Sequence, residues 1–385
     1  MSIQKTLTRD FLLSFFAQIA FSSVFFTLIP TLPIYLSRLK ITEAEIGVLI
    51  GAFNVSSLIL RPFVGRALLG ARGKKFMMAG TLLFAITSLA YLLAKPFWPL
   101  FIVRVIQGIG LALFATASFT LIVQISPEVH RGQSLSLFYL AINIAFALAP
   151  SFGMFLINLY DPSVLFLACV GLSLVAFFIS LQLKEKHPNP MEHSSQKQSL
   201  LSREAIPAGI MAYLGSFVWG AVTAFFSLYA LHHEVSNPGL FFAVLAITLI
   251  SARGLGGKLL DLYSREKILL PCLVAQIIAM ALLAFSTTLP MFFQVAVIWG
   301  LGNAFLYPTL VAYAIDLSGS SHGPAIGTYT SFSDFGVGTG AAIMGGILQL
   351  TNYPIMFLCF SLIGVLNLSY FYFSVIKGRK RYADL

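Results

Sequence analysis

The chain has 385 residues, of which 58% are hydrophobic and only 10% are charged. Soluble globular domains carry about 25% charged residues, so this composition excludes a water-soluble protein and indicates an integral membrane protein. The net charge of +10 would suit nucleic acid only if it formed one patch. The basic residues instead lie mostly on one side of the predicted membrane, in the loops between apolar segments, so we expect no nucleic-acid partner.

Twelve apolar segments follow one another along the chain, separated by charged, proline and glycine clusters. About 20 apolar residues span a bilayer core as a helix, and we expect such spans at residues 11–36, 46–69, 76–94, 100–123, 135–159, 164–183, 206–231, 240–260, 268–285, 291–315, 325–350 and 355–376. The first segment is too long for the apolar core of a cleaved signal peptide. The lipid bilayer is therefore an expected partner.

The basic residues of the loops predict the orientation in the membrane. With the first residue in the cytoplasm, eighteen Lys and Arg lie on the cytoplasmic side and only Arg38, Lys40 and Lys95 on the other. Cytoplasmic loops carry an excess of Lys and Arg. We therefore expect both ends of the chain in the cytoplasm.

The longest polar segment, residues 184–204, separates two halves of similar length. Arg61 and Arg253 each lie inside an apolar segment, each precedes a glycine by four residues, and they are 192 residues apart. Self-similarity at half the chain length is typical of duplicated transporters. We expect a six-helix bundle at 1–183, a cytoplasmic linker at 184–204 and a second six-helix bundle at 205–385.

The basic turns after Arg61 and Arg253 resemble the signature loop of the major facilitator superfamily, Gly-x-x-x-Asp-Arg-x-Gly-Arg-Arg. The second copy has Gly257, Asp261, Arg265 and Lys267 in step. In the first copy, Gly65 and Gly73 are one residue too far apart, and Leu69 replaces the aspartate that in the family helps to lock the halves. The resemblance implies an all-α membrane fold, two bundles with pseudo-twofold symmetry, and alternating access without a cofactor.

Arg104 lies within the fourth segment, ahead of Gln107, Gly108 and Gly110. An ionisable residue among apolar ones is costly unless it faces protein or a wet cavity. The segment is similar to the family's Arg-x-x-x-Gly-x-Gly motif, which in drug:proton antiporters is associated with proton transfer. The alternative is an arginine that reaches the membrane surface and anchors the helix end.

The fifth segment contains Pro150 and Gly153. Proline removes a helical hydrogen bond and bends the helix, and this stretch resembles a degenerate antiporter signature, Gly-x-x-x-Gly-Pro-x-x-Gly-Gly. The resemblance favours export over import. A kink that serves packing alone is the alternative.

Asp334 is the only carboxylate deep in any predicted span, about ten residues into the eleventh. A carboxyl group at that depth can alternate between charged and neutral forms near pH 7, which makes it a candidate proton carrier. The alternatives are a permanent ion pair with Arg61 or Arg253 and hydrogen bonds from Ser333. We expect Asp334, Arg61, Arg104 and Arg253 to take part in proton coupling.

A substrate cavity is expected among the polar and aromatic residues of helices one, four, seven and ten, namely Gln18, Gln107, Trp219, Asn303 and Tyr307. Asn303 and Tyr307 are four residues apart and share one helical face. His232 and His233 lie in a predicted external loop, where solvation is favoured over metal binding. No phosphate-binding loop or nucleophile elbow occurs, so we expect neither an enzyme nor an ATP-driven pump.

The sequence therefore predicts a proton-coupled exporter of small amphipathic molecules, similar to bacterial drug exporters, monomeric and located in the bacterial cytoplasmic membrane. Three arginines within the spans against one aspartate favour the second hypothesis, a transporter of an anionic metabolite or siderophore. The third is a membrane sensor or assembly partner without transport.

Overall fold

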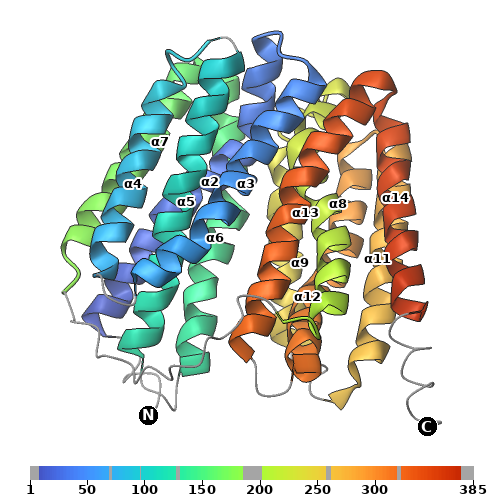
Figure 1. Cartoon of the computed structure of the whole chain (residues 1–385). Coiled ribbons are helices and arrows are strands. Elements are labelled where there is room, and N and C mark those ends of the chain that lie inside the picture. Colours follow the sequence, from blue (N-terminus) through green and yellow to red (C-terminus); the bar gives the residue numbers. More distant parts are fainter. Residues whose placement is uncertain are drawn as a thin grey trace. The chain divides into compact units, whose positions relative to one another are not determined.

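The computed structural model describes residues 8–68, 72–95, 97–126, 131–184, 202–256, 262–318 and 322–373. Twelve helices of at least 18 residues occupy these ranges (Figure 1), and each covers most of one predicted span. They are α2 (Arg9–Arg38), α3 (Glu43–Ala67), α4 (Gly73–Ala90), α5 (Phe97–Ile125), α6 (Arg131–Leu159), α7 (Pro162–Leu181), α8 (Ile206–His232), α9 (Gly239–Gly256), α11 (Arg265–Phe285), α12 (Leu289–Ser318), α13 (His322–Leu350) and α14 (Tyr353–Tyr370). The predicted all-α fold of twelve helices is confirmed.

Ten of these helices are long and apolar enough to cross a membrane by length and composition. The other two are α4 and α13. The first begins with Lys74 and Lys75, and the second is rich in glycine, serine and threonine around Asp334. Both have lower mean hydropathy for that reason.

The helix starts follow local capping rules where the chain turns sharply. Asp161 precedes α7, and its carboxylate accepts a hydrogen bond of 2.9 Å from the backbone N–H of Ser163. Asn352 caps α14 in the same way through the N–H of Ile355, at 3.0 Å. Proline follows each cap at the first helical turn, where its missing N–H costs no hydrogen bond.

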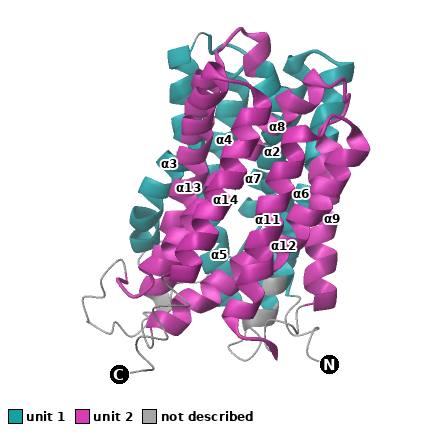
Figure 2. Ribbon diagram, turned by 90° about the vertical axis from the view of Figure 1, so that its right-hand side faces the viewer, with its two compact units in different colours: residues 1–35, 52–195 teal, residues 36–51, 196–385 magenta. Residues whose placement is uncertain are grey.

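The chain divides into two compact units, shown in Figure 2. Unit 1 comprises residues 1–35 and 52–195, and unit 2 comprises residues 36–51 and 196–385. The first turns of α3 thus belong to unit 2. The predicted division into two six-helix bundles joined at 184–204 stays a prediction.

Close packing of small residues holds these first turns of α3 in unit 2. A side chain at Gly47 would collide with the carbonyl oxygen of Ala341, and one at Gly51 would lie 2.6 Å from the carbonyl oxygen of Gly338. Both oxygens belong to α13. Small residues let two helix backbones approach closely, so this glycine pair lets the first turns of α3 pack against α13 within unit 2.

Glycines also hold α8 and α13 together inside unit 2. Side chains at Gly336 and Gly340 of α13 would collide with the backbone of Tyr213 and Phe217 on α8. Gly220 of α8 meets the carbonyl group of Val337 in the same manner. This approach of two backbones brings the polar residues of both helices into one cavity.

Candidate substrate and proton sites

A cavity of about 240 Å³ lies within unit 2 between helices α8, α9, α12 and α13. It contains four residues expected from the sequence, three as cavity residues on α8 and α12 and one, an arginine on α9, as a proton-coupling residue. The lining consists of Ser216, Trp219, Leu249, Arg253, Asn303, Tyr307, Ser333 and Val337. The structure therefore brings Trp219, Arg253, Asn303 and Tyr307 together.

Each helix contributes two lining residues that are three or four positions apart. Residues at this spacing share one face of a helix, so four faces converge on the cavity. Ser216 on α8 was not expected from the sequence, and Ser333 on α13 was considered only as a hydrogen-bond donor to Asp334; their hydroxyl oxygens lie 2.6 Å apart. The available signal was the spacing of three residues between Ser216 and Trp219 and the position of Ser333 beside Asp334.

Two polar groups of this cavity, the Arg253 guanidinium and the Asn303 amide nitrogen, can only donate hydrogen bonds. Arg253 Nε donates to the carbonyl oxygen of Ala304 at 3.1 Å, which holds the guanidinium against α12. Asn303 is 3% exposed, and its Nδ2 has no acceptor in the described part of the chain. The Tyr307 hydroxyl hydrogen-bonds with Ser216. A substrate group with acceptor oxygens would fit this wall.

Trp219 gives the same cavity an aromatic wall. Its ring centroid lies 5.1 Å from that of Trp299, which is 1% exposed. Leu249 and Val337 add apolar side chains to the lining. Ligand sites commonly combine apolar walls with a few placed polar groups, and this cavity has that composition.

Asp334 follows the lining residue Ser333 on α13 and is half-buried. It lies 12 residues after the first residue of α13, or about 18 Å along the helix axis at 1.5 Å per residue. Arg61 belongs to unit 1 and Asp334 to unit 2. A contact between them, and any role in proton coupling, stays a prediction.

Arg104 lies in a buried polar network inside unit 1. Its Nη1 donates to Gln107 Oε1 at 2.8 Å, and the Tyr91 hydroxyl donates to the same oxygen at 2.8 Å. The guanidinium carbon lies 4.4 Å from the ring centroid of Phe53. Arg104 is 6% exposed and Gln107 is fully buried, so one amide oxygen serves both a charged and a neutral donor.

Gln18, the other polar residue expected in a cavity of the first half, has its own partners. Its Nε2 donates to Ser22 on α2 at 2.7 Å, and its Oε1 accepts from Ser118 on α5 at 3.1 Å. All three side chains are buried. The structure thus places Gln18 and Gln107 in hydrogen-bonded networks of unit 1, and neither residue lines the cavity within unit 2. Tyr91 was not expected from the sequence.

The first copy of the loop motif has space at its glycines. A side chain at Gly65 would meet no described atom within 4 Å, and one at Gly73 would make only ordinary contacts, the nearest at 3.8 Å. In the second copy, Arg265 Nε lies 3.1 Å from an oxygen of Asp316, which joins the start of α11 to the last turn of α12. Gly257 and Asp261 lie outside the described residues.

Helix α6 continues through Pro150 and packs closely on α2 near this position. A side chain at Gly153 would lie 2.9 Å from the carbonyl oxygen of Thr27. The Thr27 hydroxyl donates to the carbonyl oxygen of Ala149 at 3.3 Å. The predicted kink stays a prediction, whereas the need for a small residue at Gly153 follows from this contact.

His232 and His233 lie at the end of α8 among aromatic rings. The His233 ring centroid is 4.7 Å from that of Tyr229, and the His232 ring is 6.1 Å from that of Tyr353. Among the described residues, no three His, Cys, Asp or Glu side chains gather in a way that could hold a metal ion.

Known proteins with similar sequences are transporters. The chain is 26% identical over 365 residues to the staphylopine export protein of Staphylococcus aureus, which covers 90% of this chain and 89% of that protein. It is 25% identical over 363 residues to multidrug resistance protein 2 of Bacillus subtilis, with 89% and 90% covered. It is also 25% identical over 339 residues to the quinolone resistance protein NorA of Staphylococcus aureus, with 84% and 85% covered.

Solved structures agree in fold. The nucleoside transporter NupG has a TM-score of 0.78 at 16% identity, with 94% of this chain and 98% of that chain covered. A bacterial homologue of the human lysosomal transporter Spinster has a TM-score of 0.75 at 15% identity, with 95% and 96% covered. At these identities the likeness concerns the fold alone.

The sequence model of one transporter family matches the chain twice, at residues 14–261 and 230–383, and the two matches together span nearly the whole chain. The predicted resemblance is confirmed. The protein is a multi-pass membrane protein that transports a small molecule by secondary transport, and it is not an enzyme. The chain belongs to the Major Facilitator Superfamily.

Proposed function

We propose that this protein is a proton-coupled exporter of small amphipathic molecules that works by alternating access. We place it as a monomer in the bacterial cytoplasmic membrane, with both ends of the chain in the cytoplasm. Three of its relatives are named for export or drug resistance. The proton gradient is the proposed energy source, without a bound cofactor.

The observation that carries the proposal is the composition of the unit 2 cavity. Trp219, Leu249 and Val337 offer an apolar wall, and Asn303, Tyr307 and Arg253 offer polar contacts. An amphipathic molecule presents both kinds of surface. The cavity volume of about 240 Å³ is below the 300–1,000 Å³ of typical ligand sites, so we propose that unit 2 supplies one part of the binding site.

Asp334 is the proposed proton carrier. Protons that enter from the outside would neutralise its carboxylate and favour the conformation that resets the transporter. Asp334 follows the cavity residue Ser333 on α13, so its charge lies close to the residues proposed to contact substrate. Arg61, Arg104 and Arg253 would tune this charge, because a nearby cation favours the ionised form of a carboxyl group.

A second candidate is an anionic substrate. It is favoured by two donors in the cavity wall, the guanidinium of Arg253 and the Asn303 Nδ2 group. A charged donor hydrogen-bonds a carboxylate about twice as strongly as a neutral one. This candidate predicts that Asn303→Leu weakens the binding of a carboxylate substrate by about tenfold, as expected for about 1.4 kcal/mol.

Purified protein in liposomes separates these candidates. Ethidium represents amphipathic cations and carboxyfluorescein represents organic anions, and their flux is measured with and without a pH gradient. Gradient-dependent flux of ethidium supports the first candidate, and flux of carboxyfluorescein alone supports the second. If the protein transports neither dye, nor any ligand found in a thermal-stabilisation screen, a membrane sensor or assembly partner without transport is favoured.

A tryptophan pair provides the control for the cavity. Trp219→Ala removes the aromatic wall and is expected to raise the KM for the transported dye several-fold. Trp98 lies outside the cavity and is 69% exposed, so Trp98→Ala is expected to leave KM unchanged. Equal effects of both substitutions would argue against this cavity as part of the substrate site.

A further inference from the structure

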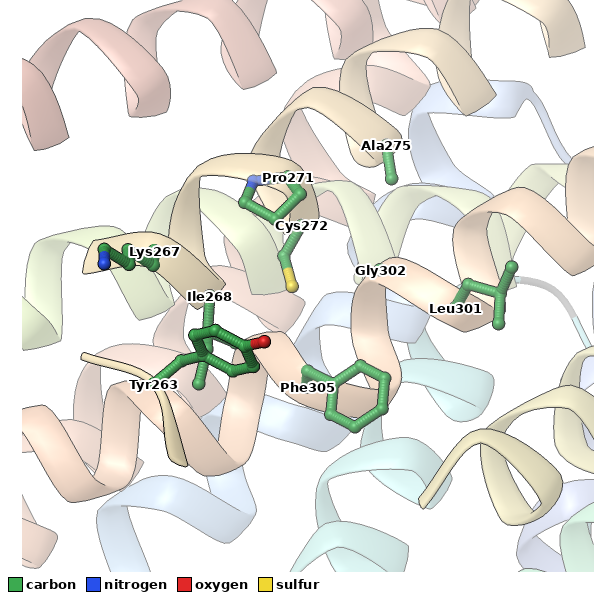
Figure 3. Close-up of a pocket in the computed structure, with 9 residues that line it drawn as sticks. All are labelled: Tyr263, Lys267, Ile268, Pro271, Cys272, Ala275, Leu301, Gly302 and Phe305. Atoms are coloured by element: carbon green, nitrogen blue, oxygen red, sulfur yellow. The ribbon is translucent and has the colours of Figure 1, made fainter. Parts of the chain in front are cut away.

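A second, larger hollow of about 510 Å³ lies between α11 and α12 in unit 2. Figure 3 shows Lys267 and Tyr263 at one end of this groove and Ala275 and Leu301 at the other. It shares no lining residue with the cavity described above. Gly302 lines the groove and Asn303 lines the cavity, so the two sites lie on different faces of α12.

The walls of the groove are apolar and continue into apolar helix faces. On α11, Leu270, Val274 and Ile278 are each more than a third exposed and four residues apart, and on α12 the same holds for Val297 and Leu301. In a membrane-spanning segment, an exposed apolar row faces lipid tails rather than water. The groove therefore opens toward lipid acyl chains.

The floor of the groove is formed by a close approach of the two helices. A side chain at Gly302 would lie 3.1 Å from both the Ala275 side chain and the carbonyl oxygen of Cys272. From Lys267 to Ala275 the groove follows α11 for eight residues, or about 12 Å. A shape this narrow and long suits one extended chain better than a compact molecule.

The end of the groove at the start of α11 is polar. Lys267 is exposed, and its ammonium group pairs with no side chain in the described part of the protein. Arg265, two residues earlier, is engaged by Asp316 at 3.1 Å. Tyr263 is 51% exposed beside Lys267, and tyrosine is enriched where a membrane meets water.

Pro271 adds an acceptor at this end. Proline has no backbone N–H, so the carbonyl oxygen of Lys267, four residues earlier, lacks its usual helical donor. A cation and a carbonyl oxygen thus lie at the head of an apolar channel, and the Tyr263 hydroxyl points from this end toward Phe305 (Figure 3). This combination complements a phosphate group with a hydroxylated head and an attached acyl chain.

We propose that this groove is a binding site for an anionic phospholipid such as phosphatidylglycerol. One acyl chain would lie between α11 and α12, and the phosphate would contact the Lys267 ammonium. Basic pockets between membrane helices bind anionic head groups in this way. The charge of Lys267 selects an anionic lipid over a zwitterionic one.

The test uses the full-length protein released from detergent with equal amounts of phosphatidylglycerol and phosphatidylcholine, and native mass spectrometry counts the bound lipids. Lys267→Gln is expected to lower the preference for phosphatidylglycerol about fivefold, which corresponds to about 1 kcal/mol for one lysine near an anionic surface. Lys184→Gln, at another exposed lysine that lies outside the groove, should leave the preference unchanged.

A second pair of variants tests the acyl-chain site. Leu301→Trp fills the end of the groove opposite Lys267 and is expected to reduce lipid retention severalfold. Val297→Trp places the same ring one turn away, on an exposed position outside the groove, and should retain lipid. The proposal is overturned if Lys267→Gln keeps the wild-type preference, or if both tryptophan variants retain lipid equally. Melting temperatures without added lipid verify that each variant is folded.

Discussion

Gln107 is predicted to stabilise the buried charge of Arg104. Gln107→Met keeps a side chain of similar length but removes the oxygen that accepts from Arg104 and Tyr91, each at 2.8 Å. A hydrogen bond from a charged donor contributes about 1.5–3 kcal/mol and a neutral one about 0.5–1.5 kcal/mol. The two lost bonds therefore cost about 2–4.5 kcal/mol.

Part of this loss is offset by the other half of the amide. Gln107 Nε2 is buried and has no acceptor within the described residues, and an unsatisfied buried donor costs about 1–3 kcal/mol. Methionine removes that donor as well. The net destabilisation is about 1–2 kcal/mol, or a fall of about 2–8 °C in melting temperature for a unit of this size.

The assay is thermal unfolding of the purified protein in detergent, with two comparison variants. Gln107→Glu keeps an acceptor for both donors and is expected to melt above Gln107→Met. Gln18→Met removes a bond to Ser22 and one from Ser118, neither of which involves a charge, so its effect should be smaller. Two results would show that the amide oxygen does not stabilise the buried charge of Arg104. One is a melting temperature of Gln107→Met within one degree of wild type, and the other is a melting temperature equal to that of Gln107→Glu within the error of measurement.

Two further predictions concern packing and pH. Gly340→Ala should lower the melting temperature and the yield of folded protein, because the new methyl group would collide with the Phe217 backbone. At Gly346 on the same helix, a new methyl group would meet nothing within 4 Å, so Gly346→Ala should be neutral or stabilising. Equal melting temperatures of the two variants would contradict this packing. Burial, and secondarily His232, lower the pKa of His233 below its ordinary value of 6.5, so its neutral form favours the folded state. The stability that this gives is present above pH 6.5 and is lost as the pH falls through the folded pKa. His233→Asn should therefore reduce the fall in melting temperature between pH 7 and pH 5, and a fall as steep as that of wild type would refute the assignment.

Hydropathy and charge were sufficient to predict the twelve helices, because each span must satisfy its own backbone hydrogen bonds in the bilayer. The resemblance of the loop and helix motifs to those of the superfamily was sufficient to predict the family. Asn303 and Tyr307 could be predicted as cavity residues, since polar groups in an apolar span need a protein or substrate contact. Trp219 was predicted from its place on the seventh segment together with them.

Other features depend on tertiary contacts that no local pattern encodes. Gln107 appeared equally suited to a cavity, and only the positions of Arg104 and Tyr91 place it in a buried network. The first turns of α3 join unit 2 because Gly47 and Gly51 fit against α13. Ser216 and Ser333 meet through the close approach of two helix backbones, which requires knowing that the two helices are neighbours.

Transport by Asp334→Asn in liposomes is the sharpest test of the proposed proton coupling, with Glu234→Gln as the control at an exposed carboxylate outside the cavity. The dye identified as substrate is followed with and without an imposed pH gradient. We expect Asp334→Asn to bind the dye but no longer to respond to the gradient, whereas Glu234→Gln should respond as wild type does. Gradient-driven transport at the wild-type rate by Asp334→Asn would contradict the assignment of Asp334 as the proton carrier.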